Sequence, residues 1–370
     1  MSHVLEYYNH LHTIPELGFE EVKTSAFIAS KLKEFGFTDV QTGVGGTTGV
    51  VATLDSGKPG PVVLLRADMD CLAHNIEGET VLRHTCGHDG HSSMLLATAE
   101  EVIKNHTVKS GTLKFLFQPA EELGTGAHAI ADAGVLEGVD YAFGAHVRPI
   151  EEAANGQAVA AIYYASSATI QATFTGVTSH AARPHLGVNA LDAAVLAINA
   201  VNTIHLRPTE SYSVKATQFH ADSGVTNSIP GKAFVTWDLR AQMNPTMKEL
   251  HEKVIMAITN AGQANGCTVE YDDSKMLTAA EHNEECVALL EDVISDVLGK
   301  ENMVPAVITP GGEDFWVYTN RYPNLKAGFF GLGCDLKPGL HHPDMSFDTS
   351  ALENGVKIYL ALLAKLGTVA

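Results

Sequence analysis

Residues His84–His91 hold the densest group of metal-binding side chain types in the sequence: one thiol, three imidazoles and one carboxylate within eight positions. Thiolate sulfur and imidazole nitrogen are ligands suited to zinc and similar divalent metals. A solvated loop with incidental histidines would explain any one of these residues alone. The density of the segment, together with the acids and histidines further along the chain, favours a metal site.

An adjacent pair of acids, Glu121 and Glu122, follows the apolar run Thr112–Gln118. Neighbouring carboxylates repel each other, so burying both requires a compensating positive charge, which a metal can supply. One carboxylate can then bind the metal while its neighbour acts as a general base on a water molecule. A surface turn with two solvated acids is the alternative for this pair taken alone.

Two further histidines complete this group of candidate ligands. His146 stands at the end of the apolar run Tyr141–Val147, and His341 lies in the segment Leu340–Pro343. A histidine at the mouth of a strand is more commonly a hydrogen-bonded structural residue. Here, however, candidate ligands recur in or beside the loops that follow predicted strands, and in open α/β sheets that edge is where ligands bind.

The middle of the chain carries polar residues of a different kind. Ser179–His185 and Thr226–Pro230 are polar segments between apolar runs, and Arg240 lies on a predicted strand. Such donors can hold a substrate carboxylate or a developing oxyanion. Ordinary turn-forming residues are an equally good explanation of these segments.

Apolar patterns predict an α/β architecture in which strands and helices alternate. Buried strands are expected at Val50–Leu54, Val62–Ala67, Thr112–Gln118 and Tyr141–Val147. Helices are expected at 20–35, where Gly36 occupies the position of a C-terminal cap, at 92–104 and at about 283–298.

The pattern changes near residue 167 and predicts an inserted second domain over 167–275, with 1–166 and 276–370 forming the first domain. Strands are expected at 168–175, 233–241 and 268–271. Two helices are indicated by the apolar positions Val188, Leu191, Val195 and Ile198, and then by Met247, Leu250, Val254 and Ile258. Two helices on one face of an antiparallel sheet would explain this order.

The formal net charge is −19, which disfavours binding to nucleic acid or to anionic membranes. The five cysteines are an odd number and are scattered, as expected of reduced thiols. The sequence has no pattern of a signal peptide and no run of about 20 apolar residues. We therefore expect a cytoplasmic location.

Six segments in this order resemble the two-metal metallopeptidase and aminoacylase family, in its amidohydrolase branch. This branch includes hippurate hydrolases and N-acyl-amino-acid amidohydrolases. The segments are Arg66–Asp70, Cys86–His91, Gln118–Glu122, Ser179–His185, Gly311–Phe315 and Leu340–Pro343. The resemblance implies a zinc-peptidase-like catalytic domain with a central mixed sheet, and an inserted smaller α+β domain of ferredoxin-like fold that serves as lid and dimerisation domain. It also implies a homodimer or a higher homo-oligomer.

The resemblance also implies two divalent metal ions, with zinc or manganese favoured and cobalt or nickel as alternatives. Cys86 would bridge the two ions. The other ligands would be His88, Glu122, His146 and His341, the last preferred over His342 because it directly follows a leucine and lies two positions before a proline.

Glu121 would be the general base that passes a proton from water to the leaving amine. Asp68 and Asp70 are expected to orient the histidine ligands, as carboxylates commonly do. The expected substrate contacts are His180, Asn227, Arg240 and Glu313, and His180 can act across a dimer interface in this family.

The sequence departs from the family pattern after Asp70, where it reads Cys71-Leu72-Ala73-His74 and Cys86 follows early. The shortened loop is expected to reshape the substrate pocket and to leave the metal ligands in place. Cys71 and His74 are either unusual pocket residues or, as we favour, neutral changes around a deletion.

The function expected from these residues is hydrolysis of the amide bond in a small N-acyl amino acid or related conjugate. A dipeptidase or aminopeptidase of the same fold needs the same activation of water. A hydrolytic deaminase or decarbamoylase is a further alternative that the shortened loop would permit. An inactive metal-binding scaffold is disfavoured because Glu121 and every expected ligand are present.

Overall fold

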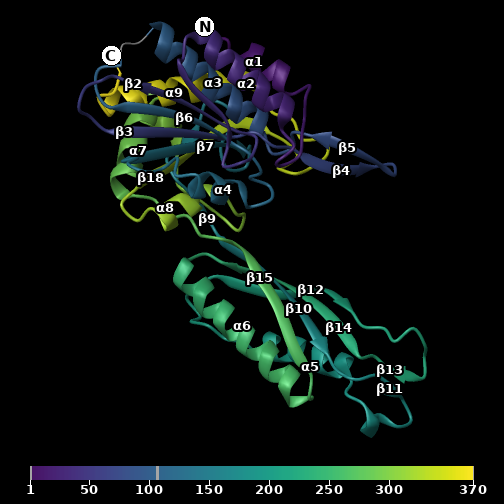
Figure 1. The fold of residues 1–370 in the computed structure, drawn as a ribbon. Helices are drawn as coiled ribbons and strands as arrows, with labels where there is room; N and C mark the ends of the chain where they lie inside the picture. The colour runs from purple at the N-terminus through teal and green to yellow at the C-terminus, as the bar shows by residue number, and fades with distance from the viewer. Residues whose placement is uncertain (1, 106–107, 370) are drawn as a thin grey trace. The chain divides into compact units, whose positions relative to one another are not determined.

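An eight-stranded mixed sheet organises the part of the chain that carries the candidate ligands (Figure 1). The computed structural model describes residues 2–105 and 108–369. These form two compact units: Met1–Tyr163, Glu281–Ile308 and Asp314–Ala370 make up the first, and Tyr164–Ala280 with Thr309–Glu313 make up the second. The inserted domain was expected over 167–275.

The strand order of this sheet is β1-β2-β6-β3-β7-β18-β8-β16. The four central strands β6, β3, β7 and β18 are parallel, whereas β1, β2 and β6 pair antiparallel, as do β18 and β8. The strand bounds are β1 Asp39–Val44, β2 Gly49–Asp55, β3 Val62–Asp68, β6 Thr112–Gln118, β7 Tyr141–Pro149, β8 Ala158–Val159, β16 Met303–Val304 and β18 Lys326–Leu336. The parallel centre places the carboxyl ends of four strands at one edge.

Helices cover both faces of this sheet. One face shares an apolar core with α1 (Val4–Leu11), α2 (Val22–Phe35), α3 (His88–Asn105), α7 (Glu284–Leu298) and α9 (Leu352–Lys365). Phe330 of β18 belongs to that core, so its neighbour Phe329 points to the other face. There Phe329 contacts Phe315 and Trp316 of the short helix η3 (Asp314–Trp316). Close to η3 lie α4 (Gly126–Asp132) and α8 (Val317–Arg321).

Smaller elements complete the first unit. A two-stranded hairpin, β4 (Leu72–Ile76) and β5 (Glu79–Arg83), extends away from the body of the unit (Figure 1). It occupies the segment that the sequence analysis described only as a shortened loop. The remaining short elements are β9 (Ile162–Tyr164), β17 (Val307–Thr309), η2 (Lys300–Asn302) and η4 (Thr349–Ala351).

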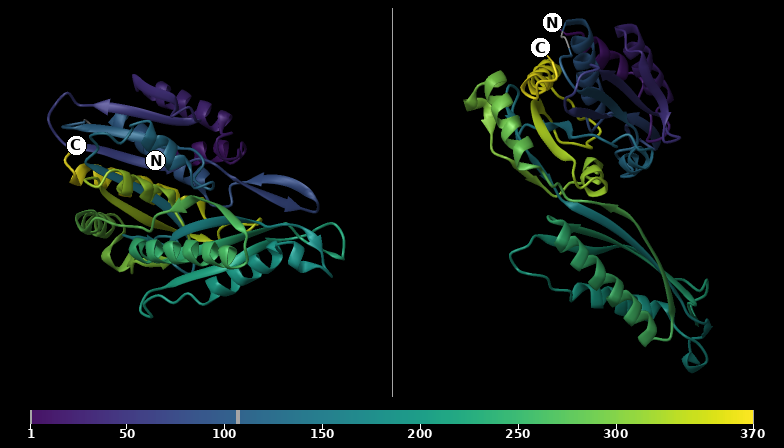
Figure 2. Two further views of the ribbon diagram at one scale, coloured as in Figure 1. Left: turned by 60° about the horizontal axis from the view of Figure 1, so that its bottom comes forward. Right: turned by 60° about the vertical axis from the view of Figure 1, so that its left-hand side comes forward.

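The second unit has the chain order β-α-β-β-α-β, which is the ferredoxin-like arrangement. Its antiparallel sheet has the order β12-β14-β10-β15, and α5 and α6 lie on one face of it (Figure 2). The bounds are β10 Ser166–Thr175, α5 Ala190–Asn202, β12 Tyr212–His220, β14 Lys232–Ala241, α6 Asn244–Ala264 and β15 Thr268–Leu277. The pair β11 (Ser179–His180) and β13 (Ser228–Ile229), with η1 (Pro184–Leu186), extends from it.

Helix α5 presents to the core a face that only partly matches the apolar positions indicated by the sequence, of which Val188 and Ile198 pack against that core. Its buried residues are alanines with Val201, whereas Val195 is 40% exposed. Small side chains allow α5 to pack closely against α6 and the sheet, which leaves Val195 and Leu196 on the outer surface. Strand β12 was not predicted, because this edge strand is mostly exposed on both faces and shows no apolar alternation.

Within the described ranges, none of the helices is both long enough and apolar enough to cross a membrane.

Candidate active site

The candidate ligands lie at the edge where the parallel strands end. Asp70 follows β3, the acidic pair follows β6, His146 lies near the end of β7, and His341 follows β18. Cys86 lies two residues before His88, which is the first residue of α3. Because β6, β3, β7 and β18 are adjacent and parallel, side chains far apart in the sequence meet at this edge.

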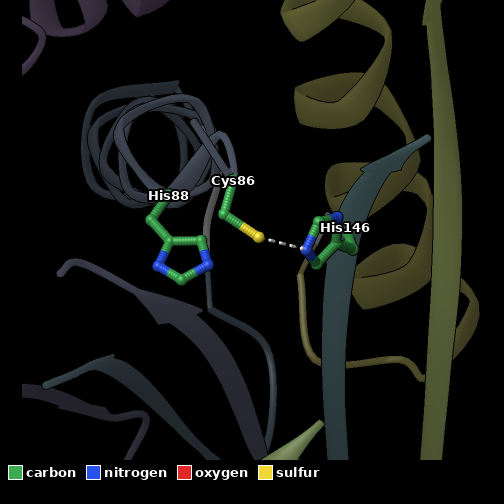
Figure 3. Close-up of side chains that lie close together, drawn as sticks. All are labelled: Cys86, His88 and His146. Carbon is green, nitrogen blue, oxygen red and sulfur yellow. Dashed lines mark hydrogen bonds between the residues drawn. The ribbon is translucent and has the colours of Figure 1, made fainter. Parts of the chain in front are cut away.

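Cys86 is common to two groups of donor atoms. Its Sγ lies 3.4 Å from Nε2 of His146 and 3.3 Å from Nε2 of His341. One group is Cys86, His88 and His146 (Figure 3), and the other is Cys86, Glu122 and His341. In each group the donor atoms all lie within 4.8 Å of one another. A thiolate shared by two groups has the arrangement needed to bridge two cations.

Asp70 fixes three parts of this site at once. Its Oδ1 accepts a hydrogen bond from Nδ1 of His88 at 3.1 Å and from the backbone N–H of Glu121 at 3.2 Å. Its Oδ2 accepts from the backbone N–H of Glu122 at 3.0 Å. With Nδ1 of His88 engaged, Nε2 is the nitrogen left for a ligand, and that atom is buried without a hydrogen-bond partner. These three hydrogen bonds are the contacts that an orienting role of Asp70 requires, and that role stays a prediction.

His146 and His91 differ in which ring nitrogen is available. Nδ1 of His146 donates to the Val147 carbonyl at 2.6 Å, so Nε2 faces the sulfur of Cys86. His91 accepts the Val147 N–H on Nε2 at 2.9 Å and donates from Nδ1 to Asp68 at 2.7 Å. Both nitrogens of His91 are thus occupied, which excludes this histidine of the Cys-Gly-His-Asp-Gly-His segment as a ligand.

The donor set fits divalent cations. A buried polar atom without a partner is costly, and both Nε2 of His88 and Oε1 of Glu122 are such atoms among the described residues. Burial raises the pKa of the Cys86 thiol well above its usual range. A thiolate at this position therefore requires a nearby positive charge. Burial also lowers the pKa of His146, which keeps it the neutral imidazole that a metal binds.

The two acids differ in their neighbours. Glu122 lies 3.4 Å from Nε2 of His341 and belongs to the group around Cys86, whereas Glu121 does not. Glu121 Oε2 lies 3.8 Å from Nε2 of His88, and these two residues form a further donor group with Glu122. The neighbouring carboxylate of Glu122 raises the pKa of His341. Glu122 therefore shares a donor group with Cys86 and His341, and Glu121 does not.

A buried polar network supports this edge from behind. Arg66 donates to Asp68 at 2.7 Å, to Asp314 at 2.8 Å and to Gln118 at 2.9 Å, and all of these side chains are buried. Asp68 thus holds His91 and is itself held by Arg66. Of these four residues, Asp68 alone was expected at the site from the sequence. For Arg66 and Gln118 the available signal is a charged or amide side chain within or at the end of an otherwise apolar strand, whereas Asp314 lies in η3 and has no such signal.

The predicted substrate contacts have the following places. His180 and Asn227 lie close together in the second unit, where the N–H of Ala181 donates to the Asn227 carbonyl at 2.8 Å. Both side chains are exposed. Arg240 lies on β14 and pairs with Asp238 at 3.0 Å. Glu313 is buried and directly precedes Asp314.

The two residues of the shortened loop also have defined places. Cys71 is buried, and burial raises its pKa to about 12, so it is a protonated and unreactive thiol. Nε2 of His74 lies 2.8 Å from Oγ1 of Thr85, at the base of the hairpin.

Comparison with known proteins decides the family. The model of Peptidase family M20/M25/M40 matches residues 64–365. The chain belongs to this family. It is 31% identical to the IAA-amino acid hydrolase ILR1-like 5 of Arabidopsis thaliana, over 85% of this chain and 74% of that protein. It is also 31% identical to the hippurate hydrolase of Campylobacter jejuni, over 95% of this chain and 88% of that protein.

Solved structures of the family share the fold. The YXEP protein of Bacillus subtilis, a dinuclear metal binding peptidase from the M20 family, aligns with a TM-score of 0.80 at 24% identity and covers 99% of this chain and 98% of its own. The aminobenzoyl-glutamate utilization protein of Klebsiella pneumoniae aligns with a TM-score of 0.79 at 23% identity, over 98% and 95% of the two chains. The expected mixed α/β fold is confirmed.

Proposed function

We propose that this chain is a metal-dependent amidohydrolase that cleaves the amide bond of a small N-acyl amino acid or related conjugate. The observation that carries the proposal is the sulfur of Cys86, shared by two donor groups beside the acidic pair Glu121 and Glu122. Relatives named as hydrolases of hippurate, of IAA-amino acids and of p-aminobenzoyl-glutamate support it. Each of these compounds joins an acyl group to an amino acid by an amide.

In this proposal Cys86, His88, Glu122, His146 and His341 hold two divalent ions. Divalent ions held there supply Lewis acidity, which polarises the scissile carbonyl and acidifies water. Zinc suits a set of one thiolate, three imidazoles and one carboxylate, and manganese, cobalt and nickel are alternatives.

The chain's own residues hold the base and move the proton. Asp70 fixes the backbone of Glu121, so the carboxylate is held beside the donor cluster. Glu121 accepts the proton of the attacking water and delivers it to the nitrogen of the leaving amine. Both transfers occur at one carboxylate, because the acid formed in the first step is the donor in the second.

The second unit serves in this proposal as a lid and dimerisation domain. His180, Asn227, Arg240 and Glu313 contact the substrate, and Arg240 must then exchange its ion pair with Asp238 for one with the substrate. The open edge of β12, together with Val195 and Leu196 on the outer surface of α5, supports a homodimer. A cytoplasmic location remains a prediction from the sequence.

The test is amine release from N-acetyl, N-benzoyl and longer N-acyl amino acids and from dipeptides, with added zinc or manganese. We expect release from the acylated set. Glu121→Ala should keep its metal and lose turnover by roughly two to four orders of magnitude, the usual weight of general acid–base catalysis. The exposed acid Glu151 provides a matched control, and Glu151→Ala should be fully active.

Three results would change the proposal. An unchanged rate in Glu121→Ala would remove Glu121 as the base. Preference for dipeptides would favour a peptidase, the activity in the names of the thermostable carboxypeptidases, which are 28–29% identical to this chain. Release from neither set by a metal-loaded chain would direct the search to deaminase and decarbamoylase substrates.

A further inference from the structure

His341 is the least enclosed of the five proposed ligands. The His341 side chain is 55% exposed. The other four are buried or nearly so, and the most exposed of them, Glu122, is 11% exposed. Its backbone is also left-handed, with φ of 64°. For a residue other than glycine that conformation is unfavourable, because Cβ then lies close to the following carbonyl oxygen. Contacts from elsewhere in the fold must therefore hold His341 in place.

The loop that carries His341 is closed at its base and held near its tip. At the base, Lys337 and Ser346 exchange two backbone hydrogen bonds of 3.0 and 2.8 Å. Near the tip, the backbone N–H of His341 donates to the Thr85 carbonyl at 2.8 Å. Leu340 and Met345 of the loop pack against the apolar core of the first unit. A further polar contact comes from Arg83, whose Nη1 donates to the Pro343 carbonyl at 2.7 Å. The guanidinium of Arg83 also lies 3.5 Å from the carboxylate of Asp344.

Both strands of the β4–β5 hairpin contribute to this arrangement. Arg83 is the last residue of β5, and its carbonyl accepts the N–H of Thr85 at 3.0 Å. His74 of β4 reaches the hydroxyl of Thr85 at 2.8 Å. The hairpin and the residues that follow it thus contact the loop at two points that flank His342. The Thr85 carbonyl accepts from the N–H of His341, and Arg83 donates to the Pro343 carbonyl.

We propose that Arg83 is a positioning residue for His341 and sets the affinity for the ion held by Cys86, Glu122 and His341. This inference rests on the metal site of the proposed function. The other donor group has separate supports, because Asp70 orients His88 and the Val147 carbonyl orients His146. Loss of the Arg83 side chain should therefore weaken the binding of one ion and leave the binding of the other unchanged.

The test uses Arg83→Met, which keeps a long apolar side chain and removes the donors. Metal per chain is measured by elemental analysis after equilibrium dialysis over a range of zinc or manganese concentrations. We expect two ions in the unmodified chain. In Arg83→Met one ion should bind about ten- to hundred-fold more weakly, the usual effect of losing a group that orients a ligand. Arg83→Lys, which keeps a positively charged donor group in place of the guanidinium, should lie between the two.

A matched control is Arg321→Met, since Arg321 is 47% exposed in the same unit and pairs with Asp132 through its guanidinium. It should bind both ions as the unmodified chain does. At saturating metal, Arg83→Met should recover its kcat with KM unchanged. In the presence of chelator its melting temperature should match that of the unmodified chain, because Arg83 is 42% exposed.

The inference is overturned if Arg83→Met binds both ions with unchanged affinity, or if both weaken equally. A raised KM at full metal occupancy would make Arg83 a substrate contact instead, and a lower melting temperature in chelator would make its role merely structural. An unmodified chain that binds no pair of ions would refute the proposed function itself, whatever the behaviour of Arg83.

Discussion

Three buried histidines near the start of α3 and the end of β7 differ in the ring nitrogen that remains free. Asp70 accepts a hydrogen bond from Nδ1 of His88, and the Val147 carbonyl accepts one from Nδ1 of His146, so both histidines present Nε2 to the site. His91 presents neither nitrogen, because the Val147 N–H occupies its Nε2. At residue scale, the hydrogen-bond partner and not the residue type separates a candidate ligand from a structural histidine.

Substitution of the shared sulfur tests both donor groups at once. Cys86→Ala removes the one donor common to the two groups, so we expect metal per chain to fall well below two in elemental analysis. Cys267→Ala is the control, since Cys267 is a buried thiol in the second unit. Full occupancy in Cys86→Ala would eliminate Cys86 from the ligand set.

At the scale of elements, the turn that carries Glu121 depends on a distant buried acid. Ala120 has a left-handed backbone, with φ of 54°, and its N–H donates to Oε1 of Glu21 at 2.9 Å. The other oxygen of Glu21 accepts from the hydroxyl of Thr48. Glu21 is fully buried at the N-terminus of α2, so it ties that helix to the catalytic turn.

Removal of that acid should loosen the turn. Glu21→Ala leaves the Ala120 N–H without its acceptor, which we expect to destabilise the fold by about 1–3 kcal/mol. Turnover should fall by up to about 100-fold, because a small displacement of a catalytic group is costly. Denaturant unfolding and kcat measure the two effects. Glu20→Ala, at the exposed neighbouring acid, should change neither, and a fully active, fully stable Glu21→Ala would refute the dependence.

The dependence of folding stability on pH distinguishes the ionisation of the Glu21 carboxyl group from the hydrogen bonds that it accepts. Burial raises the pKa of Glu21, so the folded chain holds this proton more tightly than the unfolded chain. Stability must then fall as the pH rises through the pKa of Glu21 in the unfolded and then the folded chain. Glu21→Gln keeps an acceptor for Ala120 and cannot ionise, so this variant should lose that part of the pH dependence.

Elements with strong periodicity were predictable, and elements that depend on distant partners were not. The strand predicted at Thr112–Gln118 has those bounds in β6, and Met247, Leu250, Val254 and Ile258 are all buried on α6. The parallel strands then bring the sequence-predicted ligands to one edge. The link between Glu21 and Ala120 spans 99 positions, so no local pattern reveals it. The hydrogen bond from Arg83 to the Pro343 carbonyl spans 260 positions and is equally invisible to a local pattern.

At the scale of the whole molecule, all five proposed ligands belong to the first unit, and the second unit has its own apolar core. A ligand that binds only the folded form of one unit stabilises that unit. The chain has two tryptophans, and each unit contains one: Trp316 in the first and Trp237 in the second. Both are fully buried, so the fluorescence of each reports the unfolding of its own unit.

Chelation should therefore separate the two units in thermal unfolding. In Trp237→Phe, where Trp316 alone reports, free metal at about one hundred times its Kd should stabilise the first unit by about 2.7 kcal/mol for each bound ion, relative to chelator. Each ion then raises the melting temperature of a unit of this size by roughly 5–10 °C. In Trp316→Phe, where Trp237 alone reports, the melting temperatures with metal and with chelator should agree within about 1 °C. That difference is well below the shift expected for the first unit. Equal shifts would mean that both units unfold as one cooperative block, and a shift seen only by Trp237 would place the metal in the second unit.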